Sequence, residues 1–141
     1  MATHLLKHAM EEFVLGGPIQ IHKLSKSKIY LRQILQTRKS VPLISLGFAS
    51  SVITTQEKCM ANARRVTYPY LLIIGEKDEI VNNKVTRAWF SKTSSKEKQI
   101  KLMVGAYHEL AKEPNNHVMF ESCLKFMADR IIASNKTFGD F

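Results

Sequence analysis

The sequence predicts an α/β protein in which helices form the N-terminal half and a β-α-β-α unit with parallel strands follows. Two apolar runs, at 68–75 and 99–105, have the composition of strands, and each ends at a glycine. The first run does not alternate between apolar and polar residues, which is typical of a parallel strand covered by helices on both faces. Helical patterns at 82–93 and after Pro114 complete the β-α-β-α order.

The N-terminal half has helical spacing that turn residues interrupt. Apolar residues predict a short helix at 3–15, which Gly-Gly-Pro then ends. Two further helical segments are expected at 24–35 and 43–65, separated by Pro42. The expected core contacts of the longer segment are Leu46, Ile53, Met60 and Ala63.

In the C-terminal half, Trp89 and Phe90 are expected to pack against the sheet. His117 opens the last helix and is expected at the surface. The final residues have the polar and glycine-containing composition of a frayed tail. One apolar stripe along the last helix predicts an amphipathic element; its members are Phe120, Cys123, Leu124, Met127 and Ile131.

The formal net charge of +9 raises the question of nucleic-acid binding. No Asp or Glu occurs between Phe13 and Gln56, but the basic residues there are scattered rather than dense. No RNP-like aromatic pattern and no Cys/His finger is present. We therefore expect a solvated basic face and no nucleic-acid partner, with attraction to an anionic membrane surface as an alternative.

The two cysteines, Cys59 and Cys123, have the spacing of neither a disulfide framework nor a metal site, so a reducing, cytoplasmic location is expected. No apolar run approaches the roughly 18 residues that span a bilayer, and the first residues lack the long apolar region of a signal peptide.

His4, His8 and Glu11 share one helical face and could bind zinc. An exposed helix face is the expected interpretation, so no metal and no cofactor is predicted.

An acid and a histidine follow the two predicted strands. Asp78 comes three positions after Gly75, and His108 comes three positions after Gly105. Alone, each would be an ordinary turn or structural residue, but if the strands are neighbours, both side chains emerge at the same edge of the sheet. A carboxylate that accepts from one ring nitrogen fixes the histidine tautomer, so the other nitrogen can act as a base. Asp78 and His108 are therefore the candidate catalytic residues.

These loops resemble the C-terminal part of the α/β-hydrolase superfamily. More narrowly, they resemble the monoacylglycerol lipase and lysophospholipase group, which is also classed with the serine aminopeptidases. In that group a P-x-L-x-x-x-G-x-x-D-x-x-V strand and loop carries the acid, and a G-A-x-H-x-L loop carries the base. The first pattern is filled by Pro69, Leu71, Gly75, Asp78 and Val81, the second by Gly105, Ala106, His108 and Leu110, and Glu113 fits the acid that often follows the histidine.

The resemblance implies an organisation and an activity. Residues 1–66 would be a helical cap-like segment, 67–133 the C-terminal portion of the hydrolase core, and 134–141 a tail. The implied activity is that of a serine hydrolase acting on lipid carboxylic esters, in which Asp78 orients His108 and no cofactor takes part. The substrate would be a lipid ester or another small ester, met through peripheral contact with a membrane.

The nucleophile that the resemblance implies is not in this chain. These hydrolases carry their serine on a G-x-S-x-G elbow, and no such motif occurs here. The nearest approach is Leu-Ile-Ser-Leu-Gly at 43–47, where Leu43 replaces the first glycine of a tight turn. Its serine, Ser45, also lies too close to Asp78 to leave room for the intervening strand and cap. We therefore expect an unknown nucleophile, a chain that is inactive by itself, and the missing N-terminal half of the hydrolase as its partner.

Two other functions are compatible with parts of this pattern. A non-catalytic interaction module on a hydrolase scaffold would explain the missing serine elbow, and a serine-directed probe would then label nothing even after upstream sequence is restored. A basic nucleic-acid-binding protein would bind DNA or RNA with a steep salt dependence. The order of acid and histidine after successive strands disfavours the second of these.

Overall fold

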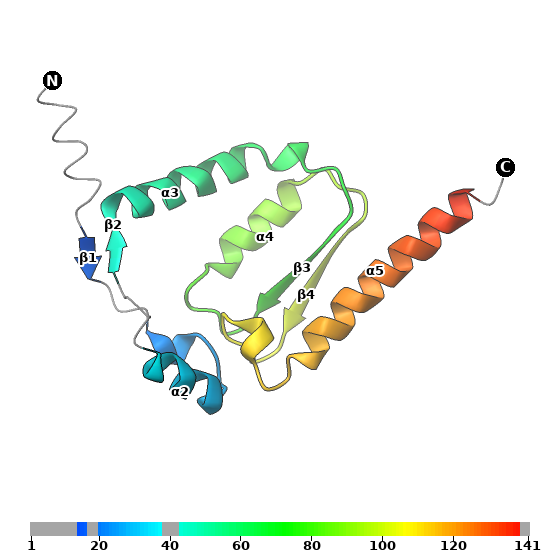
Figure 1. Ribbon diagram of the computed structural model, residues 1–141. Coiled ribbons are helices and arrows are strands. Elements are labelled where there is room, and N and C mark those ends of the chain that lie inside the picture. The colour runs from blue at the N-terminus through cyan, green and yellow to red at the C-terminus, as the bar shows by residue number, and fades with distance from the viewer. Residues whose placement is uncertain (1–13, 17–19, 38–42, 139–141) are drawn as a thin grey trace, which may run out of the picture.

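The computed structural model describes residues 14–16, 20–37 and 43–138, and Figure 1 shows their arrangement. The strands and helices form two short sheets with flanking helices. In chain order they are β1 (Val14–Gly16), η1 (Ile21–Lys23), α2 (Lys28–Gln36), β2 (Leu43–Ser45), α3 (Leu46–Ala61), η2 (Ala63–Arg65), β3 (Tyr70–Gly75), α4 (Asn83–Lys92), β4 (Lys98–Met103), η3 (Leu110–Lys112) and α5 (His117–Phe138), where η marks a 3₁₀ helix. No helix in these ranges is both long and apolar enough to cross a bilayer.

Strands β3 and β4 confirm the predicted parallel β-α-β unit. They pair in register from Tyr70 opposite Lys98 to Gly75 opposite Met103, and they lie between α4 and α5 in Figure 1. The ring of Tyr70 lies 5.6 Å from that of Trp89 and 5.8 Å from that of Phe90, measured between centroids. These contacts bear out the expectation that Trp89 and Phe90 pack against the sheet.

The apolar stripe of α5 does not face this small sheet. Phe120, Leu124 and Met127 are 48%, 64% and 51% exposed, although α5 itself contacts both strands. His117 is exposed at the start of the helix, as expected. The periodicity of the sequence therefore identified an amphipathic helix, while the described part of the protein leaves much of its apolar face open to solvent.

The N-terminal half differs from the prediction at its strands. Residues 43–45, expected to be helical, form β2 and pair antiparallel with β1, and Val14 and Leu15 are strand rather than helix end. Local helical spacing failed here because main-chain pairing between distant segments decided the structure. The rest of the helix expected at 3–15 lies outside the described residues.

Helix α3 runs from Leu46 along the far side of α4 in Figure 1. Among its expected core contacts, Ala63 at the helix end is buried, but Ile53 is 58% exposed. Leu46 and Met60 are half-buried. The prediction of a buried apolar face therefore holds at the C-terminal end of this segment and is wrong at Ile53.

Helix α2 begins four residues later than expected, at Lys28, because Ser27 caps it by accepting a hydrogen bond from the Tyr30 N–H at 3.3 Å. The preceding residues form η1 and an irregular link, which together with Ser27 we call segment 20–27. Figure 1 shows η1 and α2 beside the carboxyl ends of β3 and β4. The N-terminal half thus reaches the edge of the sheet where the candidate catalytic residues lie.

Candidate active site

Two loops cross at the carboxyl ends of β3 and β4. A Cβ placed on Gly75 would lie 2.3 Å from the carbonyl oxygen of Tyr107 and 2.8 Å from that of Ala106. The Lys77 N–H donates to the Ala106 carbonyl at 2.8 Å. This bond joins the loop after β3 (residues 76–82, the acid loop) to the segment after β4 (residues 104–112, the base loop). Gly75 is therefore required by the close approach of two main chains, and this approach brings the acid and base loops together.

The acid loop holds Asp78 by its own main chain. The N–H groups of Ile80 and Val81 both donate to Oδ1 of Asp78 at 2.9 Å. The side chain is only 10% exposed. This local turn fixes the carboxylate and directs its second oxygen, Oδ2, toward the base loop.

His108 and Asp78 form a hydrogen-bonded pair. Nδ1 of His108 lies 3.0 Å from Oδ2 of Asp78. Because an ionised carboxylate can only accept, Nδ1 carries the proton and donates it, which leaves Nε2 as the nitrogen that can accept one. The His108 side chain is 31% exposed, so solvent or a substrate can reach the ring.

The surroundings of Asp78 favour its ionised form. Partial burial raises the pKa of Asp78 and is the largest single effect. The Val81 N–H, the His108 ring and the Ile80 N–H act in the opposite direction, and together they hold the pKa of Asp78 below its ordinary value. The carboxylate is therefore charged at neutral pH and can stabilise a protonated His108.

The neighbouring acids have other contacts. Oε2 of Glu76 accepts from the Gly105 N–H at 2.7 Å, where Gly105 adopts a φ of 68° that favours glycine. Oε2 of Glu79 lies 2.7 Å from Nζ of Lys23. Of the three acids in this loop, Asp78 alone hydrogen-bonds His108 among the described residues.

Segment 20–27 docks on the base loop, a contact that no pattern in the sequence predicts. The Glu109 N–H donates to the Leu24 carbonyl at 2.7 Å, and Oγ of Ser25 donates to the Lys112 carbonyl at 2.9 Å. Oε1 of Glu113 accepts from the Lys26 N–H at 3.1 Å. The partners are distant in sequence, and each of the three bonds uses at least one main-chain group, which any residue could supply. The sequence therefore carried no signal for this contact except the acid at Glu113.

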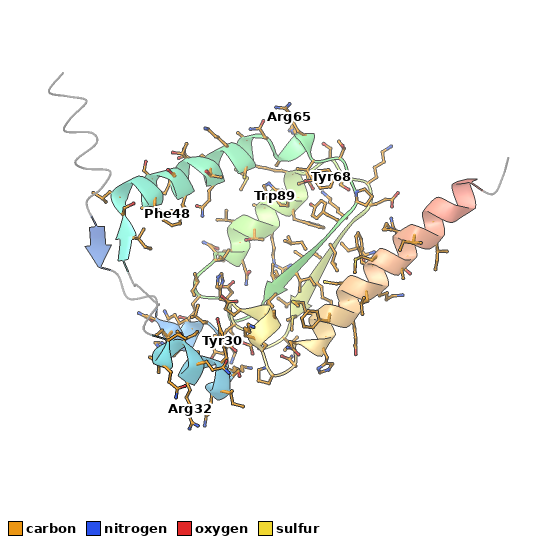
Figure 2. All side chains as sticks on the ribbon, viewed as in Figure 1. Tyr30, Arg32, Phe48, Arg65, Tyr68 and Trp89 are labelled. Carbon is orange, nitrogen blue, oxygen red and sulfur yellow. The ribbon has the colours of Figure 1, made fainter. Side chains whose placement is uncertain are left out.

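A cavity of about 450 Å³ lies between α3, the acid loop and α4. Ile80 and Val81 line it, and their N–H groups hold Asp78. Trp89, labelled in Figure 2, lies on the α4 side and donates from Nε1 to the Cys59 carbonyl of α3 at 3.2 Å. The remaining lining residues are Gln56, Cys59, Met60, Asn82, Val85 and Thr86.

Ser45 does not have the geometry of a serine elbow. Its backbone is ordinary extended chain, whereas an elbow serine lies on a strained turn. Its Oγ accepts from the Phe48 N–H at 3.1 Å and so caps α3. The possible zinc group of His4, His8 and Glu11 lies outside the described residues, and within those residues no cluster could hold a metal ion.

Comparisons with known proteins give one family and one fold. The model of the family described as "Serine aminopeptidase, S33" matches residues 1–115. A solved monoacylglycerol lipase from Paleococcus ferrophilus is similar over 91% of this chain and 50% of its own, with a TM-score of 0.80 and 22% identity. A soluble variant of monoglyceride lipase from Saccharomyces cerevisiae, solved with a substrate analogue, is similar over 89% of this chain and 46% of its own, with a TM-score of 0.73 and 18% identity. No curated protein sequence matches the chain.

The structural similarity establishes the fold. Both lipases superimpose on most of this chain, which has the architecture of the C-terminal part of an α/β-hydrolase. The chain spans about half the length of these two solved structures.

Proposed function

Because the chain belongs to the serine aminopeptidase S33 family, we propose that it supplies the acid and the base of a serine ester hydrolase. The observation that carries the proposal is the 3.0 Å hydrogen bond between Nδ1 of His108 and Oδ2 of Asp78 at the carboxyl ends of two parallel strands. In this arrangement Nε2 of His108 is the proton acceptor and Asp78 is its orienting partner.

The proposed reaction is the hydrolysis of an ester in two steps. Nε2 of His108 takes the proton of a serine hydroxyl as its oxygen attacks the ester carbonyl, and then gives that proton to the leaving alcohol. In the second step the same nitrogen deprotonates a water molecule as it attacks the carbonyl of the acyl-serine, and that proton then returns to the serine oxygen as the acid leaves. Asp78 stabilises the positive charge on His108 in both steps.

We place the serine outside these 141 residues, which contain no G-x-S-x-G sequence. The composition of the strands supports this placement. Strand β3 carries no charged residue and is typical of the interior of a sheet, yet among the described residues it pairs only with β4. Strand β4 contains Lys98 and Lys101, as edge strands often do. The free edge of β3 is therefore the proposed contact for the part of the hydrolase that carries the serine.

The cavity beside the acid loop supports a substrate with a hydrocarbon chain. Its lining is mainly apolar, and Ile80 and Val81 connect it directly to Asp78. An acyl chain in this space would bring its ester toward the carboxyl ends of the strands. We therefore assign a lipid ester, such as a monoacylglycerol, as the substrate class, and the excess of basic residues would favour approach to an anionic membrane.

Binding of an unreactive long-chain alcohol to the purified chain is expected to change the fluorescence of Trp89. Trp89 is the single tryptophan of the sequence and lines the cavity, so the change should saturate with ligand. Filling the cavity by Val85→Phe is expected to weaken binding about tenfold through lost apolar burial. The matched control Val104→Phe, at a residue that is 73% exposed and does not line the cavity, should leave the titration unchanged. Equal weakening by both variants would contradict this binding site.

The purified chain alone is expected neither to hydrolyse a short-chain nitrophenyl ester nor to react with a fluorophosphonate probe. The sequence encoded upstream of Met1 is expected to contain an in-frame G-x-S-x-G elbow, and expression of both parts together (the assembled hydrolase) should yield ester turnover and labelling of that serine. Turnover by the chain alone that disappears in His108→Ala would show that the nucleophile is within it.

A non-catalytic interaction module is the second candidate, favoured by the absence of a serine elbow from the sequence. It predicts that the assembled protein stays unlabelled by the probe although its two parts bind each other. Labelling of the elbow serine in the assembled protein would rule this candidate out.

A further inference from the structure

Glu113 is a buried acid immediately after η3, close to the base loop. The residue as a whole is only 2% exposed. Oε1 accepts two main-chain hydrogen bonds, from the Tyr107 N–H at 3.2 Å and from the Lys26 N–H at 3.1 Å. Oε2 is also buried and has no hydrogen-bond partner among the described residues.

A buried carboxyl group with one unpaired oxygen is destabilising unless its other contacts compensate. The contacts of Glu113 join two segments that are 87 positions apart in sequence, as the Lys26 bond shows. One of its two donors, Tyr107, directly precedes His108 along the chain. The Glu113 side chain therefore holds the main chain directly before His108.

Segment 20–27, which Glu113 holds through the Lys26 N–H, contacts both loops of the site. It contacts the base loop through Leu24 and Ser25 and the acid loop through the ion pair of Lys23 with Glu79. Nζ of Lys26 additionally lies 5.8 Å from the centre of the Tyr107 ring. Glu113 lies where this segment meets the residue before His108.

We propose that Glu113 is a positioning residue for His108. Its Oε1 fixes the Tyr107 main chain and ties it to segment 20–27, so that Nδ1 of the next residue meets Asp78. The role of Glu113 is to hold the loop geometry through an oxygen acceptor, and it has no contact with the reacting atoms. The inference rests on the proposed role of His108 as the base.

The test uses nuclear magnetic resonance of the full 141-residue chain and requires no ester turnover, so its failure is separate from a failure of the hydrolase proposal. In the unmodified chain at mildly alkaline pH, long-range ¹H–¹⁵N spectra should show His108 protonated at Nδ1. In Glu113→Ala the amides of Tyr107 and Lys26 should exchange with solvent at least about tenfold faster, and His108 should shift toward the Nε2-protonated tautomer. The control Glu121→Ala, at an exposed acid of α5, should match the unmodified chain.

Two conservative variants separate an oxygen acceptor from a charge and keep the test decisive if Glu113→Ala does not fold. Glu113→Gln retains an oxygen at the same reach and should preserve the Nδ1-protonated tautomer and slow exchange at Tyr107. Glu113→Asp keeps the charge but is too short to reach both donors, so it should behave like the alanine variant. The proposal is overturned if Glu113→Asp preserves the Nδ1-protonated tautomer and slow exchange at Tyr107 while Glu113→Gln loses them. It is also overturned if Glu113→Ala folds with an unchanged His108 tautomer and unchanged exchange at Tyr107.

Discussion

Replacing His108 with alanine in the assembled hydrolase is expected to lower kcat for a soluble ester about 10⁶-fold. The serine hydroxyl then loses the proposed base, and the leaving alcohol loses its proton donor. His108 is not among the residues that line the proposed substrate cavity, so KM should change little. Steady-state kinetics on the purified assembled protein measure both constants.

Two variants serve as references for this measurement. Asp78→Asn is expected to lower kcat about 10⁴-fold, because an amide neither fixes the His108 tautomer in the same way nor stabilises its charge. His117→Ala, at an exposed histidine outside the site, should leave kcat unchanged. A loss smaller than about tenfold in His108→Ala, with the elbow serine still active, would exclude His108 as the general base.

Substitution of Gly75 by alanine is expected to destabilise the chain by about 3 kcal/mol. The added Cβ would lie 2.3 Å from the Tyr107 carbonyl oxygen, and a backbone atom cannot turn away as a flexible side chain can. The base loop must move off the end of β3, which also separates His108 from Asp78. Chemical denaturation measures the free energy of unfolding, and the Nδ1 signal of His108 reports the separation.

Gly47→Ala is the matched control for this substitution. Gly47 lies in the first turn of α3, where alanine has a higher helix propensity than glycine. The control should therefore be neutral or slightly stabilising. A Gly75→Ala variant within about 1 kcal/mol of the unmodified chain would mean that the two loops approach less closely than described.

The β-α-β-α unit was predictable because its signals are local. The apolar run of β3, the amphipathic pattern of α4 and the glycines at or just after the ends of both strands each act within a few residues. The same signals place Asp78 and His108 after successive strands. The hydrolase motif places the acid three residues after its glycine, at Asp78, and the structure joins that residue to His108.

The N-terminal half was less predictable because its structure depends on distant partners. The residues at 43–45 have helical neighbours in sequence, yet they pair with β1 as a strand. Segment 20–27 carries no sequence signal for its contact with the base loop, which follows from hydrogen bonds to Glu109 and Glu113. Ile53 fits a helical stripe but is exposed, since periodicity does not say what covers an apolar face.

The sequence by itself determined the order of the C-terminal elements and the residue types at the two loop positions, because turn chemistry and apolar periodicity operate between near neighbours. The tertiary structure alone decided that Asp78 and His108, 30 positions apart, lie 3.0 Å from each other. It also decided that Gly75 permits the crossing of their loops and that Glu113 ties the base loop to segment 20–27. These contacts depend on packing of parallel strands and on buried hydrogen bonds between distant segments. They contribute to stability only once folding has brought those segments together.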